Sequence, residues 1–423
     1  MLATLVNSLR IPEIRKKLAF TAAMLALYRV GAYIPAPGIN VDAVEQIAGN
    51  FAGSNVLGFL NLFSGGSLQR FAIFALGIMP YITASIILQL MQVVVPSLEK
   101  LRKEGEVGQR KITQYTRYLT VALALAQSIG YVFLFRSFGA SAGASVVDNF
   151  NFATVFVIVI TLTAGCVVIM WLGELITQRG IGNGISLMIF ASIVAGLPQG
   201  IQAWWTNPDQ VFKVMMPFLA LGIIAAIVFI QEGQRRIPVQ YAKRVVGRRM
   251  SGGGSTYLPL RVNMAGVIPV IFAASIMAFP PTIGELSQAG WAGDIAAFFS
   301  PNGWAYLVGE SIFIVLFTYF YTAVTFNPVE QADNLKKYGG FIPGVRPGRP
   351  TAEFLDRILA RLTFPGALYL AAVAALPTIL INQTSANFFF GGTSILIVVG
   401  VALDTMKQLE AQLMMRNYEG FLK

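Results

Sequence analysis

Residues 61–91 read NLFSGGSLQRFAIFALGIMPYITASIILQLM, and their second half indicates how this chain folds. Residues 71–95 are almost entirely apolar, and this run is long enough to cross a membrane as a helix, which needs about 20 such residues. The first half differs, because a short, half-apolar segment is interrupted by Gly65 and Gly66 and carries Arg70 directly before the span. The sequence therefore predicts a membrane helix preceded by a small, weak segment with a charge at the joint.

The composition indicates an integral membrane protein. Of the 423 residues, 55% are hydrophobic and only 12% are charged, whereas a soluble domain carries about 25% charged residues. The absence of histidine and the single cysteine exclude a His-dependent catalytic triad and an intrachain disulfide, and they argue against a zinc site. We expect no metal and no cofactor. No small-residue cleavage site follows the apolar residues 18–34, so this segment is expected to stay as a span.

Ten apolar segments are candidates for membrane helices: roughly 18–34, 71–95, 118–135, 152–175, 183–201, 211–231, 264–283, 305–326, 364–382 and 392–408. Their continuous apolar runs do not fit a transmembrane barrel, which needs alternating strands of about ten residues. Ten spans can split into five and five, and an odd number per half makes the second half enter from the other side. Such inverted repeats commonly place a pathway at the interface between the halves. The joint is expected in residues 198–212, where Pro198, Gly200 and Pro208 would suit a hinge.

The distribution of basic residues predicts the orientation. Of the 31 lysines and arginines, 27 lie in the two terminal segments and in alternate loops between the spans. Because positively charged loops stay in the cytoplasm, both termini are expected to be cytoplasmic. The four remaining basic residues lie on the opposite side: Arg29, Arg70, Arg136 and Lys213.

Two long basic loops are predicted on the cytoplasmic face, at residues 232–263 and 327–363. The first contains RIPVQYAKRVV, an alternating run typical of a β-strand, and the second is rich in glycine and proline, which predicts a shaped turn rather than a helix. Together they could dock an acidic or RNA-rich partner. Ordinary loops whose charge only sets the orientation remain the alternative.

The predicted membrane interior offers little chemistry. Glu174, Glu310 and Asp404 lie near the ends of predicted spans, where solvated or paired structural roles are expected. The segment GIGNGIS at 180–186 lacks the lysine and the spacing of a phosphate-binding loop, and it reads as a tight turn. This interior favours a conduit for varied, partly apolar cargo. A secondary transporter for a small solute and an intramembrane enzyme are the competing classes, and both lack their expected titratable or nucleophilic groups.

Seven blocks distributed over the whole chain together resemble the SecY/Sec61-alpha family, in its bacterial form. They read FSGGSLQRFAIFALGIMPYITASII, EGEVGQRKITQYTRY, MWLGELITQRGIGNGISL, GQRRIPVQYAKR, NMAGVIPVIF, FNPVEQADNLKKYGGFIPGVRPG and FGGTSILIVV. The resemblance implies an all-α polytopic membrane protein with ten transmembrane helices in two pseudo-symmetric five-helix halves, 1–200 and 201–423. The halves form a clamshell around a central hourglass pore. The implied function is a protein-conducting channel, not an enzyme, that moves unfolded polypeptides across the bacterial inner membrane and releases apolar segments sideways into lipid.

The resemblance also assigns roles to individual positions. The implied pore ring is Ile78, Ile82, Ile185, Ile189, Ile271 and Ile397. The implied plug is a short helix at about 56–70, represented by Asn61, Phe63, Ser64, Gly65, Gly66 and Arg70. The glycines would weaken it by about 1 kcal/mol each, and Arg70 is expected to face the outer funnel; a re-entrant loop that only packs is the alternative.

The remaining implied positions concern the gate and the partners. A lateral gate would lie between spans two and three on one side and spans seven and eight on the other, with Thr83, Gln127 and Phe279 as candidate lining residues. The residues expected to contact the SecA ATPase or the ribosome are Arg236, Arg248, Arg249 and Arg346. The other implied partners are SecE and SecG subunits, signal-sequence-bearing chains and membrane lipid.

Overall fold

A helix lies in each of the ten segments predicted as spans. These helices are α2 (Pro12–Gly31), α5 (Met79–Val94), α7 (Glu106–Ala142), α8 (Phe152–Arg179), α9 (Gly184–Thr206), α10 (Gln210–Glu232), α11 (Ile268–Met277), α14 (Trp304–Thr325), α16 (Arg349–Thr384) and α17 (Gly392–Gly420). Among the described residues, six helices are long and apolar enough to cross a membrane. The number rises to seven if α5 and the following α6 (Pro96–Lys103) form one span, bent by 98°.

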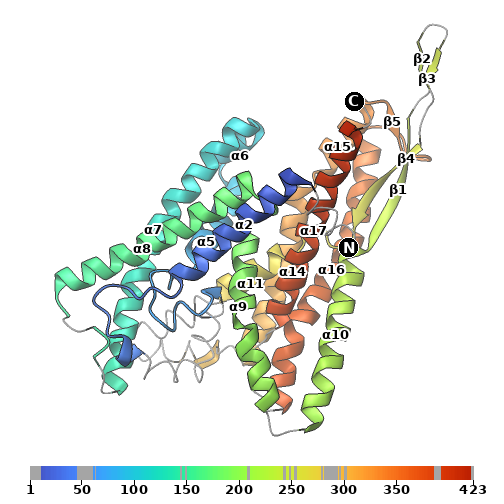
Figure 1. The fold of residues 1–423 in the computed structure, drawn as a ribbon. Coiled ribbons are helices and arrows are strands. Elements are labelled where there is room, and N and C mark those ends of the chain that lie inside the picture. Colours follow the sequence, from blue (N-terminus) through green and yellow to red (C-terminus); the bar gives the residue numbers. More distant parts are fainter. Residues whose placement is uncertain are drawn as a thin grey trace.

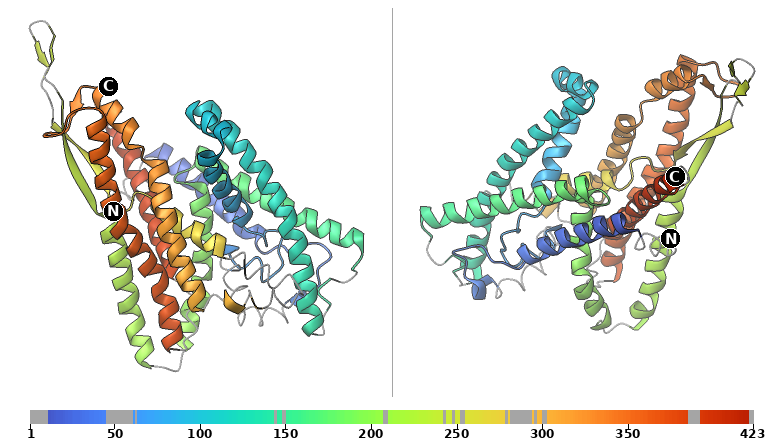
Figure 2. Two further views of the ribbon diagram at one scale, coloured as in Figure 1. Left: turned by 180° about the vertical axis from the view of Figure 1, so that it is seen from behind. Right: turned by 45° about the horizontal axis from the view of Figure 1, so that its top comes forward.

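This computed structural model describes most of the chain: residues 11–44, 61, 63–142, 145–147, 150–206, 210–241, 244–246, 249–251, 255–277, 280, 294, 297–299, 303–384 and 392–420. Figure 1 shows α2 and α5–α8 on one side of the molecule and α10, α14, α16 and α17 on the other, with α9 and α11 between them. The view from behind shows the same grouping (Figure 2). In both views α6, α15 and the small sheet lie at the same end of the helices, which is the end that carries the basic loops.

The second predicted span begins later than its apolar run. Residues 64–78 form turns, and α5 starts only at Met79, so the expectation of a helix from residue 71 is wrong. Phe71 (φ 46°) and Gly77 (φ 58°) both have left-handed backbone conformations, which a right-handed helix does not contain. A Cβ on Gly77 would lie 3.2 Å from Cα of Ser64, so this close turn requires glycine.

The two basic loops meet in one antiparallel sheet. Its central strand is β1 (Gln234–Tyr241), which pairs with β4 (Ser255–Arg261) on one side and with β5 (Gly340–Phe341) on the other. A second ribbon, β2 (Arg244–Val246) with β3 (Arg249–Ser251), extends beyond the sheet (Figure 1). The alternating run in the first loop is therefore confirmed as a strand, whereas the all-α expectation is wrong for the loops: the chain is mostly helical.

The second basic loop is only partly a turn. It contains α15 (Pro328–Lys337), whose first turn is capped by the Asn327 side chain accepting from the backbone N–H groups of Val329 and Glu330. Residues 338–348 form the expected turn, and α16 already begins at Arg349. The turn prediction was therefore wrong for both flanks. At the first flank, the asparagine cap followed by proline is a helix-start signal that outweighs the later glycines.

Two buried apolar cores hold this arrangement together. The large core joins side chains of α2, the 63–78 segment, α5, α7–α11, α14, α16 and α17. The smaller core lies at the sheet, where Ile237 and Val239 of β1 and Leu260 of β4 pack with Leu355 and Leu359 of α16. Because the alternate residues of β1 face this core, the sheet is fixed directly to the end of α16.

Candidate functional site

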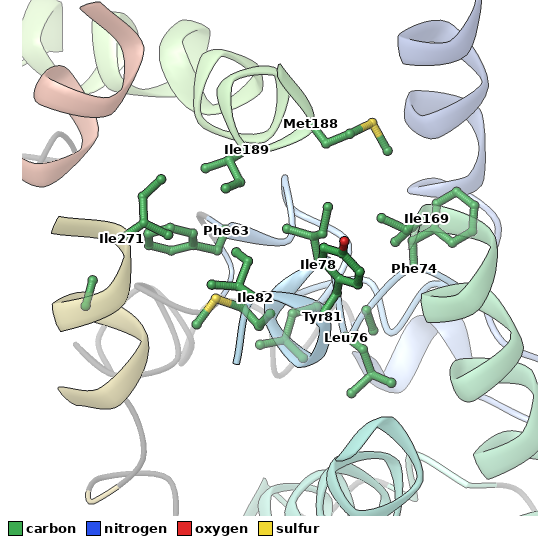
Figure 3. Close-up of a cluster of buried hydrophobic side chains, with 14 of the residues drawn as sticks. Phe63, Phe74, Leu76, Ile78, Tyr81, Ile82, Ile169, Met188, Ile189 and Ile271 are labelled. Carbon is green, nitrogen blue, oxygen red and sulfur yellow. The ribbon is translucent and has the colours of Figure 1, made fainter. Parts of the chain in front are cut away.

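The six isoleucines of the predicted ring come together in the large core. Five of them are buried members of that cluster, and Ile185 is partly buried and packs against it. They come from four helices and one helix cap: Ile78 and Ile82 at the start of α5, Ile185 and Ile189 on α9, Ile271 on α11 and Ile397 on α17. Figure 3 shows Ile82, Ile189 and Ile271 around the Phe63 side chain.

The predicted ring residues are apolar, and most of them are fully buried. Ile78, Ile82, Ile189 and Ile271 are at most 4% exposed, and Phe63 is 1% exposed. Isoleucine side chains neither donate nor accept hydrogen bonds, so they discourage water and ions without selecting a particular cargo.

A polar cavity adjoins the ring helices on the basic-loop side. It has a volume of about 410 Å³ and lies between the first residues of α9 and α11 and the middle of α17, three helices that carry ring isoleucines. Its lining includes Ser186, Ile268, Val401 and the charged side chains of Arg261, Asp404 and Lys407. The cavity thus has both charged and apolar lining residues, and none of the six predicted ring isoleucines lines it.

The segment predicted as a plug passes from helical residues, Asn61 and Phe63, into a hydrogen-bonded turn at 64–70. The Asn61 amide oxygen accepts from the backbone N–H of Gln69 at 3.0 Å, and the Ser64 hydroxyl accepts from the backbone N–H of Leu68 at 3.1 Å. Gly65 has a left-handed φ of 66°. Asn61 and Phe63 are helical, as expected, whereas residues 64–70 form turns. The helix prediction is therefore wrong only for 64–70, where the glycines permit a tight turn rather than weakening a helix. Residues 56–60 and Leu62 lie outside the described residues.

Side chains of α2 and α9 hold this turn in place. The Arg29 Nη1 donates to the Gly65 carbonyl at 2.7 Å. The Tyr28 hydroxyl lies 3.2 Å from the Ser64 carbonyl, to which it donates, and 2.6 Å from the Ser192 hydroxyl. Tyr28 and Ser192 are buried, so these bonds form away from water. The turn is thus fastened to α2 and α9. We call the three side chains that hold it the plug seat: Tyr28, Arg29 and Ser192.

Arg70 lies beside the plug seat and is exposed. Its guanidinium carbon lies 4.1 Å from the centroid of the Tyr33 ring, and that of Arg29 lies 5.1 Å from the same ring. Contact with an aromatic face stabilises a guanidinium that has water on its other side. The charge at the joint is therefore solvated rather than buried; its orientation toward an outer funnel stays a prediction.

Sequence comparison identifies the family. The model of the SecY family matches residues 72–406. The chain belongs to the SecY family. The protein translocase subunit SecY of Streptomyces galbus is 51% identical over 442 residues, and that of Mycobacterium tuberculosis strain H37Rv is 49% identical over 441 residues. In both cases the match covers 100% of this chain and 100% of the relative.

Solved structures of the SecY and Sec61 kind have the same fold. A structure described as a protein-conducting channel has a TM-score of 0.60 at 18% identity, and a SecY structure concerned with the plug domain and the membrane seal has a TM-score of 0.62 at 19% identity. Sec61 in a canine ribosome–channel complex has a TM-score of 0.61 at 18% identity. Each match covers 93% of this chain and 91% of the other.

The predicted lateral gate of this SecY-family chain is only partly described. Thr83 is buried on α5 and Gln127 is half-buried on α7, so both lie on the same side of the expected seam. Phe279 lies outside the described residues. A contact that the sequence did not indicate crosses the seam, where the Ser275 hydroxyl of α11 lies 3.9 Å from the sulfur of Met79 on α5.

The predicted partner contacts lie on exposed elements of the basic-loop end. Arg236 is exposed on β1, and Arg346 is exposed in the turn before α16. Arg249 is on β3, and Arg248 lies outside the described residues. Arg236 and Arg346 thus belong to elements joined through the β4–β1–β5 sheet and its core.

The acidic residues near the span ends have different surroundings. Glu174 of α8 accepts from Arg117 of α7 through both carboxylate oxygens, at 2.9 and 2.6 Å, so the paired role is confirmed there. Glu310 on α14 is 5% exposed, so a solvated role is wrong for it. Asp404 lines the polar cavity. Within the described part of the chain, no group of three or more His, Cys, Asp and Glu side chains is arranged to hold a metal ion.

Proposed function

We propose that this chain is the central channel subunit of a bacterial protein translocase. It moves unfolded secretory polypeptides across the inner membrane and releases apolar transmembrane segments sideways into the lipid. The observation that carries this proposal is the packing of the six isoleucines in one core, with Ile82, Ile189 and Ile271 around Phe63, in a chain of the SecY family. The relatives named above are translocase subunits, and the similar folds include one described as a protein-conducting channel and one described as a translocation channel.

The proposed architecture has ten spans in two halves, residues 1–200 and 201–423. The joint lies between α9 and α10, where the Trp204 indole N–H donates to the Lys213 carbonyl at 3.2 Å across the connection. The pore runs between the halves, with the polar cavity as its entrance from the cytoplasm and both termini on that side. The lateral gate is the seam between α5 with α7 and α11 with α14.

The ring and the plug act together at rest. The isoleucines exclude water from the narrowest point, and Phe63 fills the space among Ile82, Ile189 and Ile271. An arriving chain displaces the plug, which costs the two hydrogen bonds from Tyr28 and Arg29 to plug carbonyls but no bond to a ring side chain. The ring then closes around the chain through apolar contact alone, which accounts for tolerance of any cargo sequence.

The energy for transport comes from partners. We propose that SecE and SecG complete the membrane complex and that SecA or the ribosome docks on the basic-loop end, through Arg236, Arg248, Arg249 and Arg346. Exposed guanidiniums of Arg236 and Arg346 on linked elements suit an acidic protein or RNA surface. One similar fold comes from a ribosome–channel complex, which supports ribosome docking here.

The test uses the purified chain with its SecE-like and SecG-like subunits in lipid vesicles. With SecA, ATP and a signal-bearing unfolded preprotein, protease-protected preprotein accumulates inside the vesicles. Ring variants Ile189→Ser and Ile271→Ser raise resting ion flux, whereas Ile223→Ser on α10 serves as a matched control, because Ile223 is equally a member of the large core but not of the ring. No protected preprotein with folded complex and active SecA would overturn the function, and equal flux in all three variants would overturn the ring.

A further inference from the structure

The end of α6 reaches across to the end of α14. The Arg102 Nη2 on α6 donates to the backbone carbonyl of Val324 at 2.7 Å, although the two residues are 222 positions apart. Helix α6 follows α5 after the 98° bend and packs against α7, whereas α14 packs against α11 and α16. The bond therefore joins the two sides of the proposed lateral gate at its basic-loop end.

The Val324 carbonyl is unusually free to accept this bond. It lies in the last turn of α14, where carbonyls lose their intrahelical partners. The residue four positions ahead is Pro328, which has no backbone N–H, so the chain cannot supply the usual donor from that position. A cation at this position also interacts favourably with the negative end of the helix dipole. Arg102 thus caps α14 from a different helix.

The neighbouring basic residue on α6 behaves differently. Lys103 pairs with Glu99 on its own helix at 2.7 Å, so its charge is used locally. None of the α6 residues is buried, which means that the helix is not held to α14 by an apolar core. Arg102 is therefore a specific link from this exposed helix to the opposite side of the seam, while Lys103 carries the same charge without such a link.

We propose that Arg102 is a positioning residue that holds the lateral gate closed at its cytoplasmic end. The proposal rests on the lateral gate of the proposed function. Separation of α5 from α11 at the Met79–Ser275 contact carries α6 away from α14, and the Arg102–Val324 bond breaks. An exposed, charge-assisted hydrogen bond of this kind shifts the closed-to-open ratio by about two- to fivefold.

The experiment measures gate opening by thiol alkylation. Ser275 is 2% exposed in the closed seam, so Ser275→Cys reacts with N-ethylmaleimide only when the gate opens. The single native cysteine, Cys166 on α8, is 1% exposed and is on none of the seam helices α5, α7, α11 and α14, so it reports general loosening of the fold. The complete complex in lipid vesicles is alkylated, and peptide mass spectrometry separates the two sites.

The expected result distinguishes two charge-equivalent variants. In the Ser275→Cys background, Arg102→Ala raises the alkylation rate at position 275 by about two- to fivefold, while Lys103→Ala leaves it unchanged and Cys166 reacts equally slowly in all variants. Equal rates in Arg102→Ala and Lys103→Ala, or a parallel rise at Cys166, would overturn the proposal. Since alkylation needs no transported cargo, the result is independent of the preprotein assay, and failure of one does not imply failure of the other.

Discussion

Replacing Gly65 by alanine tests how tightly the plug turn is seated. Gly65 has a φ of 66°, and alanine in that left-handed region costs about 1–2 kcal/mol. The new Cβ would also lie 3.2 Å from Cα of Ser192 and 3.3 Å from Nη1 of Arg29, so the seat must shift by a few tenths of an ångström. Together these effects weaken the seated state by about 2 kcal/mol, which is a factor of about 30 in the equilibrium between seated and displaced plug.

The assay is the ion conductance of the complete complex in a planar bilayer without cargo. Because a displaced plug uncovers the ring, Gly65→Ala is expected to raise the resting conductance, at most by the factor of about 30 that the equilibrium allows. Gly66→Ala separates the two contributions. Its φ of 84° carries the same backbone cost, but its Cβ would only meet Nη1 of Arg70 at 3.5 Å, an ordinary contact. The expected rise in resting conductance is therefore smaller for Gly66→Ala than for Gly65→Ala.

A helical glycine provides the neutral control. Gly222 on α10 has nothing within 4 Å of its would-be Cβ, so Gly222→Ala should leave the resting conductance unchanged. If Gly65→Ala conducts no more than Gly222→Ala, the plug is not held by its close approach to α9 and the reasoning is refuted. If Gly65→Ala and Gly66→Ala conduct equally, contact with Ser192 and Arg29 contributes nothing and only the backbone cost remains.

Three further changes have defined outcomes. Arg29→Met removes the donor to the plug carbonyl and should raise the resting conductance about fivefold, from a hydrogen bond of about 1 kcal/mol; an unchanged conductance would show that the carbonyl finds water instead. Glu174→Gln breaks the two-oxygen contact with Arg117 and should lower the unfolding temperature by a few degrees, for about 1 kcal/mol after solvent screening, whereas Glu353→Gln, in an exposed pair, should not. Arg346→Glu should abolish SecA-driven secretion without reducing the amount of channel in the membrane, and normal secretion in reconstituted vesicles would contradict that contact.

The apolar segments were predictable because lipid demands continuous apolar helices. A helix lies in each of the ten, and six of the described helices are long and apolar enough to cross a membrane by themselves. The residue at which α5 starts was not predictable, because apolar residues are equally compatible with a buried turn. A better signal was available in Pro80, which occupies the first turn of α5, a position typical of proline. Hydropathy alone therefore predicts where the chain is buried but not whether it is helical there.

The ring positions followed from the family resemblance, and the residues around them followed only from the structure. Tyr28 and Ser192 are 164 positions apart and have no local pattern that distinguishes them from other polar residues in spans. Arg29 carried a detectable signal, because a charged residue inside an apolar segment usually has a specific partner. The Arg102 bond had no signal in the sequence. Its acceptor is a backbone carbonyl, and the availability of that carbonyl depends on Pro328 and on the distant packing of α14.

The union of β1, β4 and β5 with α16 has a mechanical consequence. Helix α16 has 36 residues and is therefore about 54 Å long, so it runs from the sheet core deep into the membrane region. Ile237 and Val239 fasten the sheet to Leu355 near one end of this rod. A displacement of either basic loop is therefore transmitted first to the Leu355 end of α16, because the sheet and this helix share one core.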